Sequence, residues 1–378
     1  MCANLPRRGV IAALLLASAV SAFAAASEIR RDGRHSGFYR QTNLISDIAG
    51  VALNTDPNLV NPWGIAFSPR GPIWVSDNGA GVSTVYDAIG NPLPSESAPL
   101  VVTIPPPAGS PSDTTSAPTG TVYNDSSDFV VSAGGKSGPA RFLFATEDGT
   151  VAGWNGSVDG VSAVLAFDNS ASGAVYKGLA LGNNAAGGHI YLTNFHAGTV
   201  DVLDTGFHEV TLPGMFHDPN LPAGYAPFGI QNVGGKLFVT YALQDGDQHD
   251  DVSGPGHGYI DVYDTNGMLL KRFASGGNLN SPWGIAAAPR SFGPLGGSLL
   301  VGNFGDGRIN AFDMSTGASR GPLRDSRGRP IAIDSLWGIA FGPSSGNRGH
   351  DDASPLYFTA GIAHEDHGLF GAIEPGNG

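Results

Sequence analysis

Asn61-Pro62-Trp63-Gly64-Ile65-Ala66-Phe67 joins a small turn, a glycine and a short apolar strand, and comparable openings recur five more times along the chain. The glycines of successive openings lie 51 to 58 residues apart. Self-similarity at such a period is typical of an array of supersecondary units. The six glycines are Gly64, Gly120, Gly178, Gly229, Gly284 and Gly338.

Each repeat has room for four short strands and their turns, which is the size of one propeller blade. In the first repeat, residues 72–76 and 82–86 follow the opening as runs rich in β-branched and aromatic residues. The 378 residues include 56 glycines and 27 prolines, and only 14% are charged, as expected for short strands joined by tight turns. We therefore predict an all-β fold, a six-bladed β-propeller with four-stranded blades.

The sixth repeat contains only three strand-like runs, the last of which reaches Ile373. Residues 39–45, before the first repeat, form a strand-like run that belongs to no other blade. Pairing this run with the sixth blade would close the ring and leave no open edge. We predict that the N-terminal strand completes the last blade.

The first 26 residues resemble a signal peptide. Arg7 and Arg8 precede an apolar run over residues 9–26, and Ala22-Phe23-Ala24 is a small-x-small cleavage site. We expect an exported protein, periplasmic or extracellular, with residues 27–378 forming one propeller domain. The run is too short for a good membrane span, and we expect no transmembrane segment in the mature chain.

Charge and cysteine content narrow the possible partners. The only cysteine, Cys2, lies in the signal segment, so the mature chain has no disulfide or cysteine metal ligand. The full chain carries a net charge of −13, and without Arg7 and Arg8 it has 18 basic against 33 acidic residues. This balance disfavours nucleic acid and is compatible with cation binding or with simple solubility. We expect a monomer.

The Trp-Gly-Ile-Ala opening and the turn Tyr86-Asp87-Ala88-Ile89-Gly90 resemble those of NHL and gluconolactonase-like six-bladed propellers. Residues 41–47, 61–66 and 74–79 are similar to a family of exported bacterial propellers of unknown function, over nearly the whole mature chain. The resemblance implies the fold and export, but no established activity. Gluconolactonase-like propellers hold a divalent metal with Glu, Asn and Asp, and none of their ligands is carried over here.

One face of such a ring should gather polar groups. Loops between second and third strands, and loops between blades, emerge together on what we call the channel face. Oxygen ligands from several blades that converge there could hold a hard cation such as Ca²⁺ or another divalent ion. Ordinary hairpin turns also favour Asp and Asn before Gly. The candidate metal ligands at the ends of second strands are Asp77, Glu147, Asn194 and Asn303.

Two longer loops add imidazole groups to the same face. The stretch Asp245-Gly246-Asp247-Gln248-His249-Asp250-Asp251 lies in an insertion of the fourth blade, and His364-Glu365-Asp366-His367 lies at the matching place in the sixth. Asp245, His364 and His367 are therefore further candidate ligands or general bases, although solvated acidic loops have the same composition. We expect Trp63, Trp283 and Trp337, which adjoin inner-strand glycines, to pack between blades.

Two functions remain open from the sequence. The first is a binding or scaffold propeller whose channel face contacts a protein, peptide, glycan or small molecule. The second is a divalent-metal-dependent hydrolase of the lactonase type. The first is favoured because no complete catalytic set, such as a Ser nucleophile elbow or a zinc-protease helix, is recognisable in the sequence.

Overall fold

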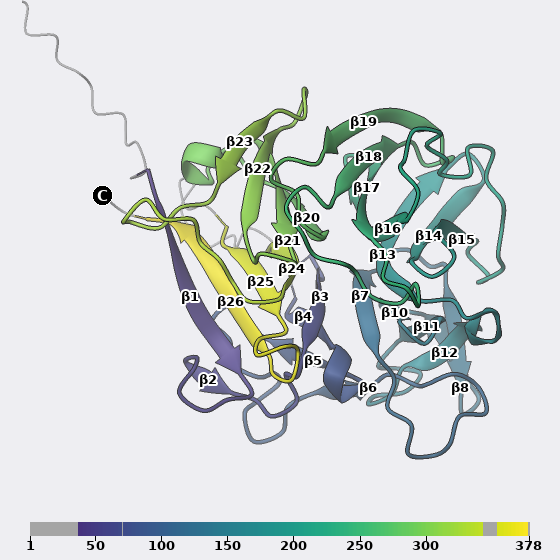
Figure 1. Ribbon diagram of the computed structural model, residues 1–378. Helices are drawn as coiled ribbons and strands as arrows, with labels where there is room; N and C mark the ends of the chain where they lie inside the picture. Colours follow the sequence, from purple (N-terminus) through teal and green to yellow (C-terminus); the bar gives the residue numbers. More distant parts are fainter. Residues whose placement is uncertain (1–36, 70, 343–353, 377–378) are drawn as a thin grey trace, which may run out of the picture. The chain divides into compact units, whose positions relative to one another are not determined.

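Six antiparallel sheets stand around a common axis in the computed structural model, which describes residues 37–69, 71–342 and 354–376 (Figure 1). Figure 1 shows one inner strand from each sheet around the centre. These inner strands are β3 (Pro62–Phe67), β7 (Pro118–Tyr123), β13 (Tyr176–Asn184), β16 (Tyr225–Val233), β20 (Pro282–Ala287) and β24 (Leu336–Phe341). The predicted all-β fold, a six-bladed propeller, is confirmed.

The remaining strands follow outward from the inner strand of each blade. Blade one adds β4 (Ile73–Asp77), β5 (Val82–Tyr86) and β6 (Val101–Thr103). Blade two adds β10 (Phe142–Thr146), β11 (Thr150–Trp154) and β12 (Val164–Asp168). Blade three adds β14 (Gly187–Asn194) and β15 (Thr199–Leu203). Blade four adds β17 (Lys236–Leu243), β18 (Tyr259–Tyr263) and β19 (Leu269–Ser275). Blade five adds β21 (Ser298–Asn303), β22 (Ile309–Asp313) and β23 (Ser319–Pro322). Blade six adds β25 (Leu356–Ala360), β26 (Leu369–Pro375) and β1 (Tyr39–Ser46).

The third blade has three regular strands, and a short segment takes the fourth place. A bridge pairs Leu203 with Glu209, and the Val210 N–H donates to the Val202 carbonyl at 2.9 Å. Outside the blade strands lie the hairpin β8 (Val130–Ala133) and β9 (Lys136–Pro139), the short β2 (Asn54–Thr55), and the 3₁₀ turns η1 (Asn78–Ala80), η2 (Ser170–Ser172) and η3 (Gly293–Leu295).

The repeated glycine is required by the close approach of neighbouring inner strands. A Cβ on Gly284 would lie 2.6 Å from the Trp337 carbonyl oxygen in the next blade, and one on Gly120 would lie 2.6 Å from the Leu179 nitrogen. Real Cβ atoms do not approach backbone this closely. The same conflict, with the inner strand of the next blade, would arise at Gly64, Gly229 and Gly338. The repeat therefore marks the contacts that close the ring around its axis.

The ring closes through β1, as predicted. β1 pairs antiparallel with β26 from Tyr39 opposite Pro375 to Ser46 opposite Leu369. The Tyr39 hydroxyl also donates to the Phe292 carbonyl of blade five at 3.0 Å. The last blade thus combines both ends of the described chain, and its four strands need the N-terminal one.

The three tryptophans are buried, as predicted, but they pack on one another at the axis as well as between blades. The Trp63 and Trp337 rings stack with centroids 3.4 Å apart, and Trp283 meets each of them edge-on at 5.8 Å. Blades one, five and six meet in this way because each tryptophan directly precedes the glycine at the narrowest part of the ring. We call this cluster the axial plug.

The proposed signal segment, residues 1–26, lies outside the described residues. Within the described ranges, no helix is long and apolar enough to cross a bilayer. Export stays a prediction.

Candidate functional site

Six residues precede the repeated glycines, and one of them is charged. These residues form one layer near the axis: Trp63, Thr119, Lys177, Phe228, Trp283 and Trp337. The Trp283 indole N–H donates to the Lys177 carbonyl at 3.0 Å, so this layer is linked across blades. Sequence analysis missed Lys177, although comparing the six openings at this position sets a lysine against four aromatic residues and a threonine.

The Lys177 side chain is only 2% exposed, yet its ammonium meets two carboxylates from other blades. It forms an ion pair with Glu147 of blade two and another with Asp250 of blade four, the latter at 3.2 Å. It also lies 5.3 Å from the centroid of the Trp63 ring. Burial alone would lower the pKa of Lys177, but the charges of Glu147 and then Asp250 outweigh it and raise the pKa. Lys177 therefore stays charged at neutral pH.

The two carboxylates differ in how they are held. Glu147 directly follows β10, is 14% exposed, and accepts a hydrogen bond from the Asn78 side chain at 2.8 Å. Asp250 lies in the long loop between β17 and β18 and is 67% exposed. The cluster thus joins a rigid strand end to a solvent-facing loop.

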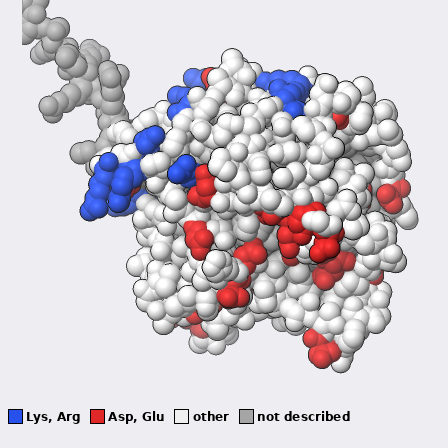
Figure 2. All heavy atoms as spheres, in the orientation of Figure 1, with Lys and Arg blue, Asp and Glu red and all other residues white. Residues whose placement is uncertain are grey.

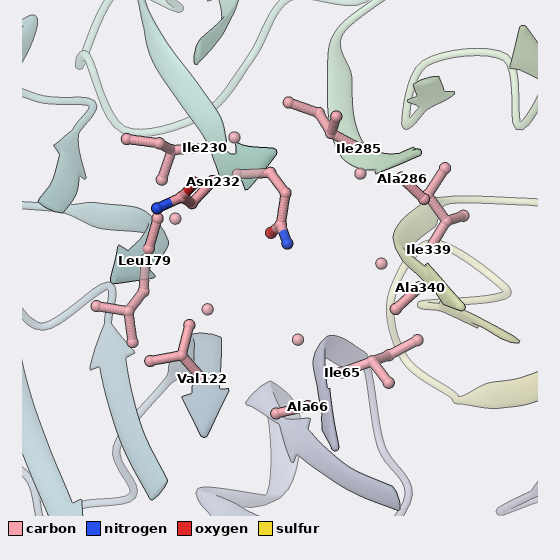
Figure 3. A pocket seen from close by; sticks show the side chains of 18 of the residues that line it. Ile65, Ala66, Val122, Leu179, Ile230, Asn232, Ile285, Ala286, Ile339 and Ala340 are labelled. Atoms are coloured by element: carbon pink, nitrogen blue, oxygen red, sulfur yellow. The ribbon is translucent and has the colours of Figure 1, made fainter. Parts of the chain in front are cut away.

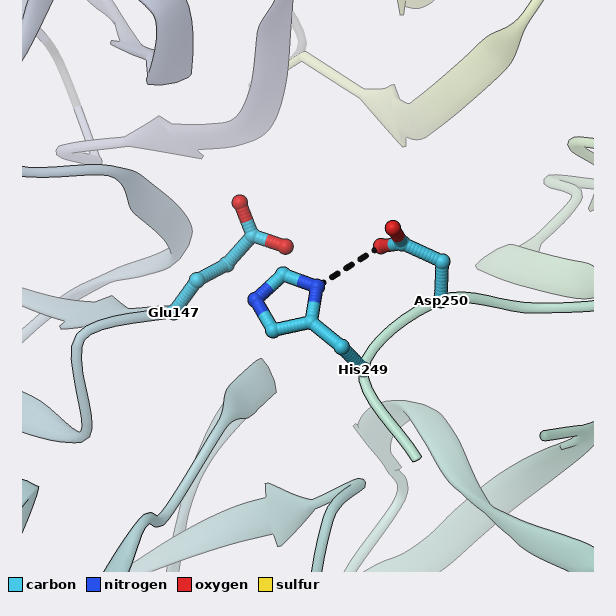
Figure 4. A group of neighbouring side chains, drawn as sticks. All are labelled: Glu147, His249 and Asp250. Atoms are coloured by element: carbon cyan, nitrogen blue, oxygen red, sulfur yellow. Dashed lines mark hydrogen bonds and ion pairs between the residues drawn. The ribbon is translucent and has the colours of Figure 1, made fainter. Parts of the chain in front are cut away.

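His249 lies between these carboxylates (Figure 4). Its Nδ1 is 3.0 Å from Asp250 Oδ1. This hydrogen bond is the main cause that raises the pKa of His249 and lowers the pKa of Asp250. Ligand atoms of Glu147, His249 and Asp250 all lie within 4.8 Å of one another, a spacing that a metal ion could use. We call Glu147, Lys177, His249 and Asp250 the axial cluster.

Asp245 shapes the loop that carries His249 and Asp250. One of its carboxylate oxygens accepts a hydrogen bond from the His249 backbone N–H at 3.0 Å, and its own N–H donates to the Asp250 carbonyl at 2.8 Å. The carboxylate of Asp245, a predicted ligand, therefore bonds to the backbone of its own loop.

Glu365 links the axial plug to the same face from blade six. Its carboxylate accepts a hydrogen bond from the Trp337 indole N–H at 3.1 Å. Ala363, His364 and Glu365 all have left-handed backbone, with φ of 57°, 60° and 69°, which non-glycine residues adopt at a cost. Burial, and next the charge of Glu147, raise the pKa of Glu365 to about 7.

The other predicted ligands at strand ends bond inside their own blades. Asp77 is fully buried and accepts from the Thr84 hydroxyl at 2.8 Å. Asn194 donates to Asp201 at 2.8 Å, and Asn303 donates to Asp306 at 3.0 Å. Of the four predicted residues, the structure brings only Glu147 to the axial cluster, because the other side chains hydrogen-bond to nearby residues instead. Metal binding by the predicted set stays a prediction.

The two predicted histidines of blade six have separate surroundings. His367 Nδ1 lies 2.6 Å from Asp47 Oδ2, so it ties the loop to the segment after β1. His364 is exposed and borders a surface cavity that also includes Glu365.

A second cavity, of about 600 Å³, occupies the channel beyond the glycine layer (Figure 3). Residues that follow the six glycines line it, and Trp283 of the axial plug borders it. Figure 3 shows aliphatic side chains from six inner strands around it: Ile65, Val122, Leu179, Ile230, Ile285 and Ile339. Gln231 and Asn232 also line this channel, which lies on the other side of the glycine layer from the charged axial cluster.

Acidic side chains are grouped on the face that Figure 2 presents. Asp and Glu lie over its middle, and Lys and Arg lie toward its left and upper margins. An acidic surface around the axis attracts cations.

Two viral proteins are similar to this chain in sequence, while no protein-family model matches it. Uncharacterized protein R648 of Acanthamoeba polyphaga mimivirus is 34% identical over 337 residues, which cover 87% of this chain and 78% of that protein. Uncharacterized protein L690 of the same virus is 35% identical over 336 residues, which cover 87% of this chain and 84% of that protein. Both relatives are viral, so they lend no support to the expected bacterial, exported family.

Solved structures support the fold. A glucose dehydrogenase aligns with a TM-score of 0.50 at 13% identity, covering 88% of this chain and 98% of that one. A structural genomics protein of unknown function from Bacteroides thetaiotaomicron aligns with a TM-score of 0.52 at 9% identity, covering 90% and 73%. Identities this low show the fold alone.

Proposed function

Since the chain belongs to the same family as proteins R648 and L690 of Acanthamoeba polyphaga mimivirus, whose names assign no activity, we propose its function from the geometry of the site. The protein is a binding propeller that takes a polar ligand on its channel face. The ligand contacts the exposed side of the axial cluster, where His249 and Asp250 reach solvent.

The observation that carries this proposal is the buried ammonium of Lys177 between Glu147 and Asp250. Removing an ammonium and a carboxylate from water is costly, and apolar side chains at the same positions would stabilise the ring at least as well. Four of the other five positions in this layer are aromatic. A charged cluster built from three blades, beside an exposed loop, is therefore better explained by recognition than by stability.

A ligand screen tests the proposal. The purified protein is screened by melting temperature and titration calorimetry against organic cations, neutral glycans, lactones and short peptides, because a ligand that binds only the folded state raises the melting point. We expect at least one class to bind, and the double substitution Glu147→Gln with Asp250→Asn to weaken it at least tenfold. Asp113→Asn with Glu96→Gln, both on exposed loops, is the matched control. Equal binding by the double variant would refute the axial cluster as the site.

A divalent cation is a second candidate, because ligand atoms of Glu147, His249 and Asp250 lie within 4.8 Å of one another. The ion would have to compete with the Lys177 ammonium for both carboxylates. Calorimetry with Ca²⁺, Mg²⁺, Mn²⁺ and Zn²⁺ tests it, together with lactone hydrolysis for the lactonase-type alternative. If none of the four ions binds, both the metal and the metal-dependent hydrolase are excluded.

We also keep export and a monomeric state as proposals. The supporting observation for export is the apolar run with its Ala22-Phe23-Ala24 site. Expression of the full chain in a bacterium, followed by cell fractionation and N-terminal sequencing, tests it. A cytoplasmic product that keeps residues 1–26 would contradict it.

A further inference from the structure

A cavity of about 640 Å³ opens on the channel face between blades five and six. The loop after β21 supplies Phe304 and Asp306, the segment before β24 supplies Asp334, and the loop after β25 supplies His364 and Glu365. We call it the side cavity. Ser253, from the loop after β17, also lines it, so its walls come from four segments of the chain.

The floor of the side cavity is an aromatic ring on a rigid support. Phe304 is half-buried, and its ring stacks on Trp337 with centroids 4.2 Å apart. Trp337 in turn stacks on Trp63 in the axial plug. This backing fixes the orientation of the Phe304 ring, and a fixed ring face suits stacking or a cation–π contact.

Carboxyl groups line the same cavity as this ring, and two of them are held by hydrogen bonds. Asp334 accepts from the Ala363 backbone N–H at 3.0 Å, and Glu365 accepts from the Trp337 indole at 3.1 Å. Residues 363–365 form part of this wall in left-handed backbone, and such strained conformations cluster at ligand sites.

The side cavity and the axial cluster differ in their positive charge. In the axial cluster, Lys177 neutralises the carboxylates. Among the described residues, no Lys or Arg lines the side cavity, and the exposed Arg308 approaches Asp306 of its wall at 3.6 Å. An anionic ligand is thus disfavoured, whereas a ligand that brings its own positive charge is favoured.

We propose that the side cavity binds an organic ammonium ion, either a protonated primary amine or a quaternary ammonium group, carried on a small apolar body. This inference rests on the proposed function and names the ligand class for the same face. The ammonium group lies over the Phe304 ring and beside the Asp334 and Glu365 carboxylates. The net charge of −13 raises the local concentration of such cations.

Calorimetry with choline and with its uncharged carbon isostere tests the proposal. Wild type should bind choline at least tenfold more tightly than the isostere. Asp334→Asn with Glu365→Gln should weaken choline at least tenfold, because both amides keep the acceptor oxygens but lose the charge. Phe304→Leu, which keeps apolar packing on Trp337, should weaken it severalfold. Glu96→Gln with Asp113→Asn, both on exposed loops, is the charge-matched control for the double variant.

The outcomes separate this inference from the proposed function. No choline binding by the wild type, or equal binding by the Asp334/Glu365 variant, overturns the ammonium site. If another ligand of the screen still depends on Glu147 and Asp250, the binding function stands while the ammonium site fails. Choline binding that depends only on Glu147 and Asp250 also overturns it, since the cation would then lie at the axial cluster.

Discussion

Lys177 shows how one residue changes the character of a repeated position. Its neighbours in the axial layer are mostly aromatic and pack at the axis, whereas its ammonium needs Glu147 and Asp250 as partners. Those partners come from two other blades, so the ion pairs of Lys177 link three blades to one another. Replacing either side of such a pair leaves a charge with little solvent around it.

We predict that Lys177→Met lowers the free energy of unfolding by about 3 kcal/mol, because Glu147 is left charged and mostly buried. Adding Glu147→Gln should restore at least half of this loss, since the uncompensated charge is then removed. Urea unfolding of both variants measures the effect. If Lys177→Met were as stable as the wild type, the Lys177–Glu147 ion pair would not contribute to stability.

Glu365 gives a prediction about pH. Its pKa is about 7 in the folded protein against an ordinary value of 4.5, so the folded state holds a proton that the unfolded state releases. Stability therefore falls as the pH rises from 4.5 to 7 and is then level. Glu365→Gln should remove this dependence and stabilise the protein at pH 8 by on the order of 1 to 3 kcal/mol, discounted for partial exposure.

Melting curves of Glu365→Gln and wild type between pH 4.5 and 8 make the comparison. The two curves should converge at the acid end and separate at the alkaline end. Parallel curves across the range would mean that Glu365 ionises normally in the folded protein.

For single residues, the sequence shows which residue types stand out but not which side chains they contact. Lys177 is recognisable once the six openings are compared, because it stands where aromatic residues recur. Its contact with Asp250 is not, because that contact depends on the conformation of the long loop after β17. Asp77 and Asn194 stood out as ligands by position, yet their side chains are used in local hydrogen bonds.

At the level of elements, the inner strands depend on their glycines. A Cβ on Gly284 would lie 2.6 Å from the Trp337 oxygen of the next blade. We predict that Gly284→Ala destabilises the ring by about 2 kcal/mol or more, since backbone on both sides must move. Gly246→Ala is the control, because a Cβ there meets nothing within 4 Å.

Thermal and urea unfolding of these two glycine variants measure the difference. Equal stability would mean that neighbouring inner strands can separate freely, contrary to the close contacts of the axial layer.

The blades were the most predictable elements because each strand follows a local alternation of apolar residues. The third blade departs from the four-stranded plan, with only a bridge at Leu203 and Glu209 in the outer place. Pairing at the outer edge of a blade depends on neighbouring loops, and the alternation of apolar residues in the sequence does not predict it.

For the whole molecule, ring closure is the main structural constraint. β1 and β26 pair over their full lengths, so both ends of the described chain hold the last blade. This was predictable from a counting argument, because the sixth repeat lacked a strand and one strand-like run before the first repeat was unassigned. No comparable argument exists for the ligand, because the propeller fold serves many functions.

Deleting residues 38–46 should therefore lower the melting temperature of the entire ring, because the open edge of β26 would be exposed. Hydrogen exchange should increase in blades five, six and one together. Exchange that increases in β26 alone would contradict a closed, cooperative ring.

The central claim is that ligands bind on the channel face of this ring. Hydrogen–deuterium exchange of the wild type, with and without the best ligand of the screen, tests it most directly. We predict protection of residues 244–251 and 361–368, in the loops that carry His249, Asp250 and Glu365. Protection confined to residues 87–92 and 264–268, in turns of the opposite face, would contradict it.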